Sequence, residues 1–297
     1  MIRTFLQPLA HGITLSCRTV DVAAPPAPRV MLLHGFPEAA FIWDEVMRRL
    51  APRVHCLAPN QRGYERSSAP AAVADYRVRH LMADLEALVA QWGGPLDLLV
   101  AHDWGGAVAW NLAAQRPELM RRLLIINSPH PATFLRELRD NPAQQRASTY
   151  MNFLARPDAG ALLAADDYRR LWPFFTAIGG AAWLDDAVRE RLREAWGHGL
   201  AAPARWYAAS PLRPPQGADD IIHSLQLPDE MVTSRVPTTV LWGEQDQALL
   251  PALLDGIERW VPSLRLVRVP EASHWIVHEQ PGRVAAEIEA ALGLGPG

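Results

Sequence analysis

Short apolar runs recur along the chain, and each of them ends in residues typical of a turn. The runs are rich in residues that favour β-structure, so we interpret them as buried strands. Between several of them the apolar positions recur at helical spacing, as at 78–92 and 107–117. Strands that alternate with helices predict an α/β fold with a mostly parallel sheet and helices on both faces. The predicted strands lie at 12–20, 29–37, 53–59, 95–103, 121–129, 236–244 and 264–270.

This alternation breaks between residues 130 and 235. The segment has no run typical of a strand, but it has helical patches, several prolines and four tryptophans (Trp172, Trp183, Trp196 and Trp206). A plain loop of about a hundred residues is not expected inside a compact domain. We therefore expect a helical cap domain at 130–235 that folds over the strand ends. The core domain would consist of 1–129 and 236–297.

Composition and charge narrow the class of protein. The chain has 297 residues, of which 49% are hydrophobic and 21% charged, as in an ordinary globular protein. The formal net charge is −3 and no basic run stands out, so neither nucleic acid nor an anionic membrane is an expected partner. No stretch approaches the roughly 20 apolar residues of a membrane span, and the start lacks the pattern of a secretory signal. We expect a cytoplasmic protein, possibly a homo-oligomer.

The stretch VAHDWGGAVAW (100–110) places an acid at a predicted sharp turn from strand to helix. A carboxylate at such a turn must be hydrogen-bonded or paired, because burying it bare is costly. Asp103 could simply be the N-cap of the following helix. It could also be the nucleophile of a nucleophile elbow, in which the small residues Gly105 and Gly106 let the backbone pass closely.

Two further polar residues follow predicted strands, Asp246 after 236–244 and His274 after 264–270. Each has a structural alternative when it is taken alone, because Asp246 could stabilise a loop and His274 could be a satisfied buried histidine. His274 and His278 have a spacing seen in metal sites, but no third ligand is near, so we expect no metal. The chain order nucleophile, acid, histidine is that of the α/β-hydrolase triad.

A fourth element lies at 34–37, where His-Gly-Phe-Pro ends an apolar strand. A backbone N–H at this place can form an oxyanion hole together with the N–H that follows the nucleophile. The candidates are the amides of Phe36 and Trp104. A simple Gly-Pro turn would also account for Gly35 and Pro37.

Together, HGFPE (34–38), AHDWGG (101–106), the acid in WGEQD (242–246) and the histidine in ASHW (272–275) resemble the epoxide hydrolases of the α/β-hydrolase superfamily. The resemblance covers about residues 10 to 290. It implies an α/β-hydrolase fold with an inserted helical cap, and a triad made of the candidates named above. Two residues depart from the family pattern, Asn60 where relatives often have Asp and Ala101 where Gly is common.

The resemblance also implies two cap tyrosines that bind the epoxide oxygen. Tyr150 and Tyr207 stand in matching contexts, STYMNFLARP and ARWYAAS, whereas Tyr168 does not and is expected to be a packing or surface residue. Asp103 would form an ester with the opened epoxide, and His274, oriented by Asp246, would activate the water that hydrolyses it. The expected partners are a small apolar epoxide and water, with no cofactor.

Four alternatives to an epoxide hydrolase can be considered. Haloalkane dehalogenases share the Asp nucleophile and resemble the chain at Trp104, but they usually carry Asn or Gln where this chain has Phe36. Fluoroacetate dehalogenases typically have Arg after the nucleophile and His-Trp in the cap, where this chain has Trp104 and Tyr150-Met151. A non-catalytic ligand receptor would be expected to lose a triad residue. A serine esterase needs a serine at the elbow.

Overall fold

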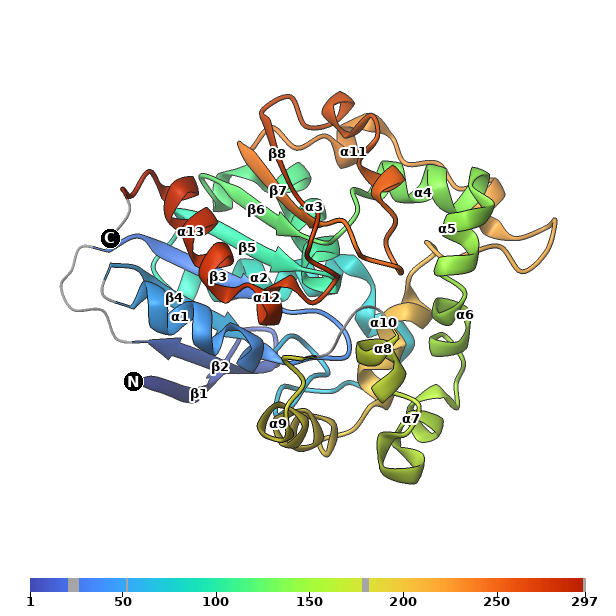
Figure 1. Cartoon of the computed structure of the whole chain (residues 1–297), viewed down its shortest axis with the longest axis horizontal. Helices are drawn as coiled ribbons and strands as arrows, with labels where there is room; N and C mark the ends of the chain where they lie inside the picture. Colours follow the sequence, from blue (N-terminus) through green and yellow to red (C-terminus); the bar gives the residue numbers. More distant parts are fainter. Residues whose placement is uncertain (21–26, 52, 178–181, 296–297) are drawn as a thin grey trace.

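The computed structural model describes residues 1–20, 27–51, 53–177 and 182–295. Eight strands of these residues form one sheet in the order β1-β2-β4-β3-β5-β6-β7-β8 (Figure 1). β2 runs antiparallel to both of its neighbours, and the strands from β4 to β8 are parallel to one another. The predicted mostly parallel sheet is confirmed. The strands are β1 (Ile2–Pro8), β2 (Thr14–Val20), β3 (Arg29–Leu33), β4 (His55–Pro59), β5 (Leu98–His102), β6 (Leu123–Ile126), β7 (Thr238–Gly243) and β8 (Leu264–Val269).

The sequence pattern did not predict β1. This strand pairs with β2 over its whole length and forms an edge of the sheet. Phe5 and Leu6 are 39% and 48% exposed there. An edge strand with most of its residues in solvent needs no continuous apolar run, so the signal that identified the buried strands is missing here.

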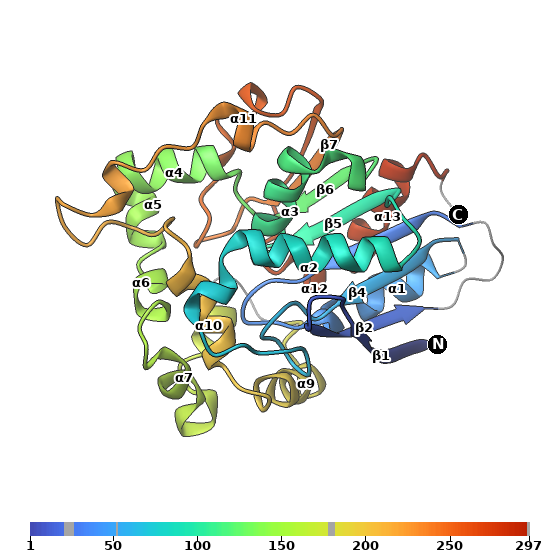
Figure 2. The same ribbon diagram turned by 180° about the vertical axis from the view of Figure 1, so that it is seen from behind.

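Helices cover both faces of the sheet, as the alternation of strands and helices predicted. α1 (Asp44–Leu50), α12 (Ile276–Glu279) and α13 (Pro281–Leu292) lie on one face (Figure 1). α2 (Val78–Gln91) and α3 (Trp104–Gln115) lie on the other (Figure 2). The residues of β5 and β7 are all buried between these layers.

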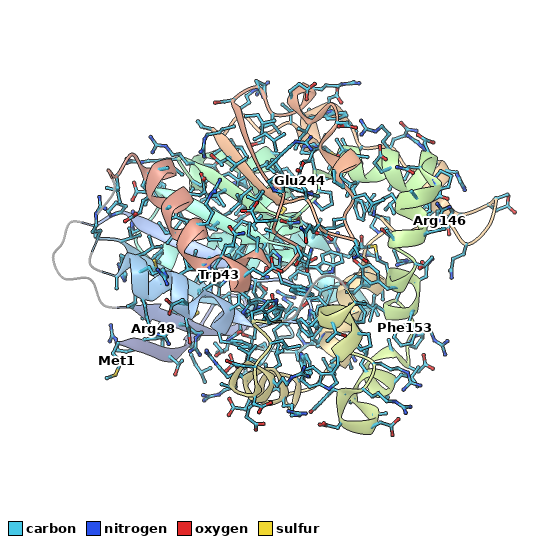
Figure 3. The ribbon with its side chains drawn as sticks, viewed as in Figure 1. Met1, Trp43, Arg48, Arg146, Phe153 and Glu244 are labelled. Atoms are coloured by element: carbon cyan, nitrogen blue, oxygen red, sulfur yellow. The ribbon has the colours of Figure 1, made fainter. Side chains whose placement is uncertain are left out.

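The region around α1 illustrates how the core is filled. Trp43, at the start of this helix, is fully buried, whereas Arg48 on the same helix points outward and has a 57% exposed side chain (Figure 3). Short 3₁₀ helices connect several of the elements. They are η1 (Ala40–Trp43), η2 (Val73–Tyr76), η3 (Pro117–Leu119), η4 (Ile221–His223), η5 (Pro251–Leu254) and η6 (Ile257–Arg259).

The segment 130–235, which we call the cap segment, lies between β6 and β7 and contains helices but no strand in its described part. Most of its helices lie beyond the carboxyl ends of the parallel strands (Figures 1 and 2). The last of them, α11, packs against α3 instead. The division into two domains at these boundaries stays a prediction. The helices are α4 (Pro131–Asp140), α5 (Pro142–Ala147), α6 (Tyr150–Leu154), α7 (Ala159–Tyr168), α8 (Trp172–Thr176), α9 (Asp186–Trp196), α10 (Ala201–Ala209) and α11 (Asp229–Val232).

A bilayer-spanning helix would have to be long and apolar along its whole length. No helix in the described ranges meets both conditions.

Candidate active site

Asp103 is the single residue between β5 and α3, and its backbone is strained. Its φ of 50° and ψ of −122° lie where residues other than glycine are rarely found. Its side chain makes no capping hydrogen bond to α3, so the N-cap interpretation does not account for it. The Ser128 hydroxyl donates to the Asp103 carbonyl at 2.7 Å and helps to fix the turn.

The turn at Asp103 requires glycine at neighbouring positions. A Cβ atom on Gly35 would lie 2.1 Å from Oδ1 of Asp103, and one on Gly105 would lie 2.7 Å from the carbonyl oxygen of His34. Both distances are far inside van der Waals contact. The HGFP turn and the AHDWGG turn therefore pack directly against each other, and this contact brings the Phe36 amide to the Asp103 carboxylate.

The Phe36 N–H donates to Oδ1 of Asp103 at 2.7 Å. Burial raises the pKa of Asp103, and this effect is opposed by the positive charge of His274 and by the backbone amides of Trp104 and Phe36. Both amides proposed for the oxyanion hole thus face the same carboxyl group. The Phe36 amide fixes Oδ1 of Asp103, and Oδ2, the other carboxylate oxygen, faces His274.

His274 lies between two carboxylates. Its Nδ1 is 2.7 Å from Oδ2 of Asp246, and its Nε2 is 3.8 Å from Oδ2 of Asp103. All three residues come from loops at the carboxyl ends of parallel strands, the place where ligands bind in open α/β sheets. Burial lowers the pKa of His274, but Asp246, Asp103 and Glu38 outweigh this effect and raise it to about 9.

The carboxylate of Asp246 is buried and fully hydrogen-bonded. Its Oδ1 accepts from the amides of Ala248 and Leu249, both at 2.9 Å, and Oδ2 accepts from Nδ2 of Asn127 at 2.8 Å. With these three hydrogen bonds made, the remaining acceptor site of the Asp246 carboxylate faces His274. The loop after β7 therefore presents the acid in a fixed orientation.

Tyr207 and Tyr150 lie together in front of the elbow. The Tyr207 ring is 5.2 Å from that of Phe36 and 5.0 Å from that of Trp104, and the two tyrosine rings are 6.1 Å apart. Burial raises the pKa of both phenols, and the negative charge of Asp103 raises it further. Both phenols are therefore protonated at neutral pH and can donate hydrogen bonds.

Tyr168 lies apart from this pair. Its ring packs against Trp196 at 5.1 Å, in an aromatic cluster between α7 and α9. The roles assigned to the three cap tyrosines from their sequence contexts stay predictions.

Glu38 and His102 belong to the same site but had no role in the sequence analysis. His102 Nε2 is 2.9 Å from the carbonyl oxygen of His274, so this nitrogen carries the ring proton. Burial lowers the pKa of His102 to about 3 and keeps the ring neutral. Its Nδ1 is therefore an acceptor, and it lies 3.7 Å from Oε2 of Glu38.

Neither of these two atoms, His102 Nδ1 and Glu38 Oε2, has a hydrogen-bond partner in the described part of the chain. The other Glu38 oxygen lies 2.5 Å from Nε2 of His278. His274 and His278 thus have different partners, and in the described residues no group of three or more acidic, His or Cys side chains is arranged for a metal ion.

Gln144 ties the cap segment to the loop that carries the acid. Its Nε2 donates to the carbonyl of Ala248 at 2.8 Å, and its Oε1 accepts from the amide of Leu250 at 3.0 Å. The side chain is fully buried. Gln144 lies on α5, six residues before Tyr150. Its two hydrogen bonds therefore connect the part of the cap segment that carries Tyr150 to the loop that carries Asp246.

Comparisons with known proteins give the family. The family model described as alpha/beta hydrolase fold matches residues 28–281. The AB hydrolase superfamily protein YfhM of Bacillus subtilis is 33% identical over 278 residues, which cover 92% of each chain. Epoxide hydrolase 4 of Mus musculus is 31% identical over 89% of this chain and 73% of its own length.

Solved structures agree with this assignment. One from a set of novel epoxide hydrolases found in metagenomes from hot environments is 31% identical, with a TM-score of 0.87 over 98% of this chain and 99% of that one. The Bacillus megaterium epoxide hydrolase in complex with an inhibitor is 27% identical, with a TM-score of 0.86 over 97% and 100%. The chain belongs to the α/β-hydrolase family and, within it, to the epoxide hydrolases. The fold and family predicted from the motifs are confirmed.

Proposed function

We propose that this protein hydrolyses small apolar epoxides to vicinal diols through a covalent ester on Asp103. The relatives named epoxide hydrolase support the reaction class. The observation that carries the proposal is the pair of protonated phenols, Tyr150 and Tyr207, in front of a carboxylate at a nucleophile elbow. The surrounding rings of Phe36, Trp104 and Phe174 would receive the apolar part of the substrate.

In the first step, Oδ2 of Asp103 attacks a ring carbon and the carbon–oxygen bond of the epoxide breaks. Oδ1 is held by the Phe36 amide, which leaves Oδ2 as the attacking atom. The departing oxygen is a poor leaving group, so it needs a proton or strong hydrogen bonds as its charge develops. The phenols of Tyr150 and Tyr207 are neutral in the free enzyme and donate these hydrogen bonds; the phenol that gives its proton to the oxygen becomes a phenolate and is protonated again when the ester is hydrolysed.

In the second step, water attacks the carbonyl carbon of the ester and His274 takes the proton. The tetrahedral oxyanion forms on an oxygen of Asp103, where the amides of Phe36 and Trp104 can stabilise it. One donor of this kind contributes about 2.7–4 kcal/mol to the stability of such a transition state. Asp246 orients the imidazole and stabilises the imidazolium that forms. The intermediate then collapses: the bond between the carboxyl carbon and Oδ2 breaks, Oδ2 leaves as a hydroxyl oxygen of the diol with the proton from His274, and the oxygen of the water stays in the Asp103 carboxylate. The second proton of the water restores the tyrosine that protonated the other diol oxygen.

Esterification also prepares His274 for its role as a base. In the free enzyme the charges of Asp246 and Asp103 hold the pKa of His274 near 9, so the imidazole is protonated at neutral pH. The ester removes the charge of Asp103, which is the nearer of the two groups to Nε2. The pKa of His274 then falls, and a larger fraction of the enzyme has a neutral imidazole that can accept a proton.

The test is a panel that pairs racemic styrene oxide with 1-bromobutane and fluoroacetate, with diol and halide release measured under the same conditions. We expect diol formation from the epoxide and little halide release. Intact-mass analysis of the His274→Ala variant with styrene oxide should locate an adduct on the peptide that contains Asp103. Halide release that outpaces diol formation, or an adduct on another peptide, would overturn the proposal.

A further inference from the structure

Helix α10, which carries Tyr207, rests on a loop of the core formed by Asn60–Tyr64. The indole N–H of Trp206 donates to the Arg62 carbonyl at 3.0 Å. Gly63 has a φ of 90°, and a Cβ atom built on it would lie 2.9 Å from Cβ of Ala202. Ala202 and Trp206 are four residues apart and therefore share one face of the helix. A side chain at position 63 would therefore overlap this face of the helix.

The loop is held firmly in the core. The guanidinium of Arg62 makes two hydrogen bonds to the carboxylate of Asp84 on α2, at 2.8 and 2.6 Å, and both side chains are buried. The same guanidinium donates to the carbonyl of Asp75 at 2.8 Å. The Gly63 amide donates to the carbonyl of Ser68 at 2.9 Å. A bidentate buried pair of this kind fixes both position and orientation.

Tyr207 follows Trp206 directly, about 100° further around the helix, and its ring lies against Trp104 and Phe36. Since a helix moves as a rigid element over one or two turns, a shift of the face at Ala202 and Trp206 must shift the phenol. We infer that the Asn60–Tyr64 loop is a positioning element for Tyr207. Gly63 and Arg62 act through α10 and so set the rate of epoxide ring opening. This inference rests on the proposed function.

The loop should influence the ring-opening step and not the hydrolysis of the ester. In the proposed mechanism Tyr207 acts during ring opening, whereas ester hydrolysis depends on His274 and Asp246, which lie on loops after β8 and β7. A displaced α10 therefore slows alkylation of Asp103 and leaves hydrolysis of the ester nearly unchanged. A general loss of structure would slow both steps.

The experiment measures both rates in single turnovers with racemic styrene oxide. In Gly63→Ala the new methyl group pushes against Ala202, and we expect alkylation to slow by about 10- to 100-fold, as for a misplaced catalytic group. Gly63→Ala/Ala202→Gly removes that contact and should recover most of the loss. The other two neighbours, a Tyr76 ring carbon at 3.0 Å and the backbone carbonyl carbon of Ala202 at 3.3 Å, are the same in both variants, so their difference reports on the contact with the Ala202 methyl group of α10.

Gly94→Ala is the matched control for backbone strain. Gly94 has a φ of 98°, close to that of Gly63, and apart from its chain neighbours no described residue has an atom within 4 Å of its added Cβ. We expect both rates to stay at the wild-type level. A loss of alkylation in this variant equal to that in Gly63→Ala would show that strain, not contact with α10, is responsible, and would overturn the inference.

Trp206→Phe tests the same inference without any strain at Gly63, because it removes the hydrogen bond to the Arg62 carbonyl and keeps an aromatic ring. We expect slower alkylation with unchanged hydrolysis. Wild-type alkylation in Trp206→Phe, or an equal fall of both rates in Gly63→Ala, overturns the inference.

Tyr207→Phe separates the two proposals: if it alkylates normally, the proposed function has failed. If it alkylates slowly but Gly63→Ala and Trp206→Phe do not, only the role of the loop has failed.

Discussion

Nε2 of His274 lies 3.8 Å from Oδ2 of Asp103, within reach of its charge but beyond a hydrogen bond. The interaction between the two side chains is therefore electrostatic, and the protonation of each group depends on the charge of the other. Two of our predictions follow from this relationship.

The pKa of His274 should fall when the charge of Asp103 is removed. Asp103→Asn keeps the size of the side chain and imitates the neutral ester. Since Asp103 raises the pKa of His274, which is about 9 in the free enzyme, the variant should titrate at lower pH. An NMR titration of the His274 ring in both proteins measures the difference. An unchanged pKa would mean that esterification does not prepare the base.

The rate of ester hydrolysis should rise with pH, because the base is the neutral imidazole. Its midpoint should lie below about 9, the pKa of His274 in the free enzyme. Single-turnover decay of the ester, formed from styrene oxide and followed from pH 6 to 10, measures the profile. A rate that is flat over this range, or that falls with pH, contradicts the role of His274 as the base.

Asp246→Asn should slow hydrolysis of the ester far more than its formation. The amide keeps part of the hydrogen bonding to the Ala248 and Leu249 amides, but it cannot stabilise the imidazolium of His274. The loss in hydrolysis should be on the order of 10⁴, as for an Asp→Asn change in a comparable triad. Pre-steady-state kinetics with styrene oxide separate the steps. Wild-type decay of the ester would show that another carboxylate orients the histidine.

Removing either tyrosine hydroxyl should slow ring opening. For Tyr150→Phe and for Tyr207→Phe we expect a loss of about 10²–10³ in the alkylation rate, by analogy with the loss of one oxyanion donor. The double variant should nearly lose alkylation, because the alkoxide would form without a donor. Tyr168→Phe is the control and should be nearly silent, since its ring packs against Trp196 instead. Wild-type alkylation in the double variant would refute the role of both phenols.

Asp84→Ala should destabilise the fold strongly. It leaves the buried guanidinium of Arg62 without its two hydrogen bonds to a carboxylate. Breaking one side of a buried ion pair costs about 3–5 kcal/mol of the free energy of unfolding. Urea denaturation measures the change. Asp158→Ala is the matched control, because it removes an equally bidentate bond to Arg156 at the surface and should change stability little.

The sequence predicted those features that depend on local pattern and chain order. Buried strands such as β5 have a continuous apolar run, and the triad candidates were found because each follows its own strand. α3 begins at Trp104, before the expected 107, because the elbow residues form its first turn. β1 was missed, because an exposed edge strand lacks the pattern.

The contacts of Glu38 could not be predicted, since Glu38 and its two neighbours come from three distant parts of the chain. Glu38 follows β3, His102 ends β5 and His278 lies in α12. Only the packing of these elements brings the side chains together. The position of Glu38 within HGFPE was visible in the sequence, but a motif gives no direction for a side chain. Contacts such as Gln144 with Ala248 are hidden for the same reason.

The buried amide of Gln144 has a consequence for protein engineering. Because it pairs with the backbone of Ala248 and Leu250, the cap segment and the acid loop are matched to each other. A cap grafted from another hydrolase would bring a different side chain to these two backbone groups and leave them buried without partners. A chimera should therefore transplant the loop 246–250 together with the cap, as one exchangeable unit, because Gln144 and Ala248 are matched to each other although they are 104 residues apart in the sequence.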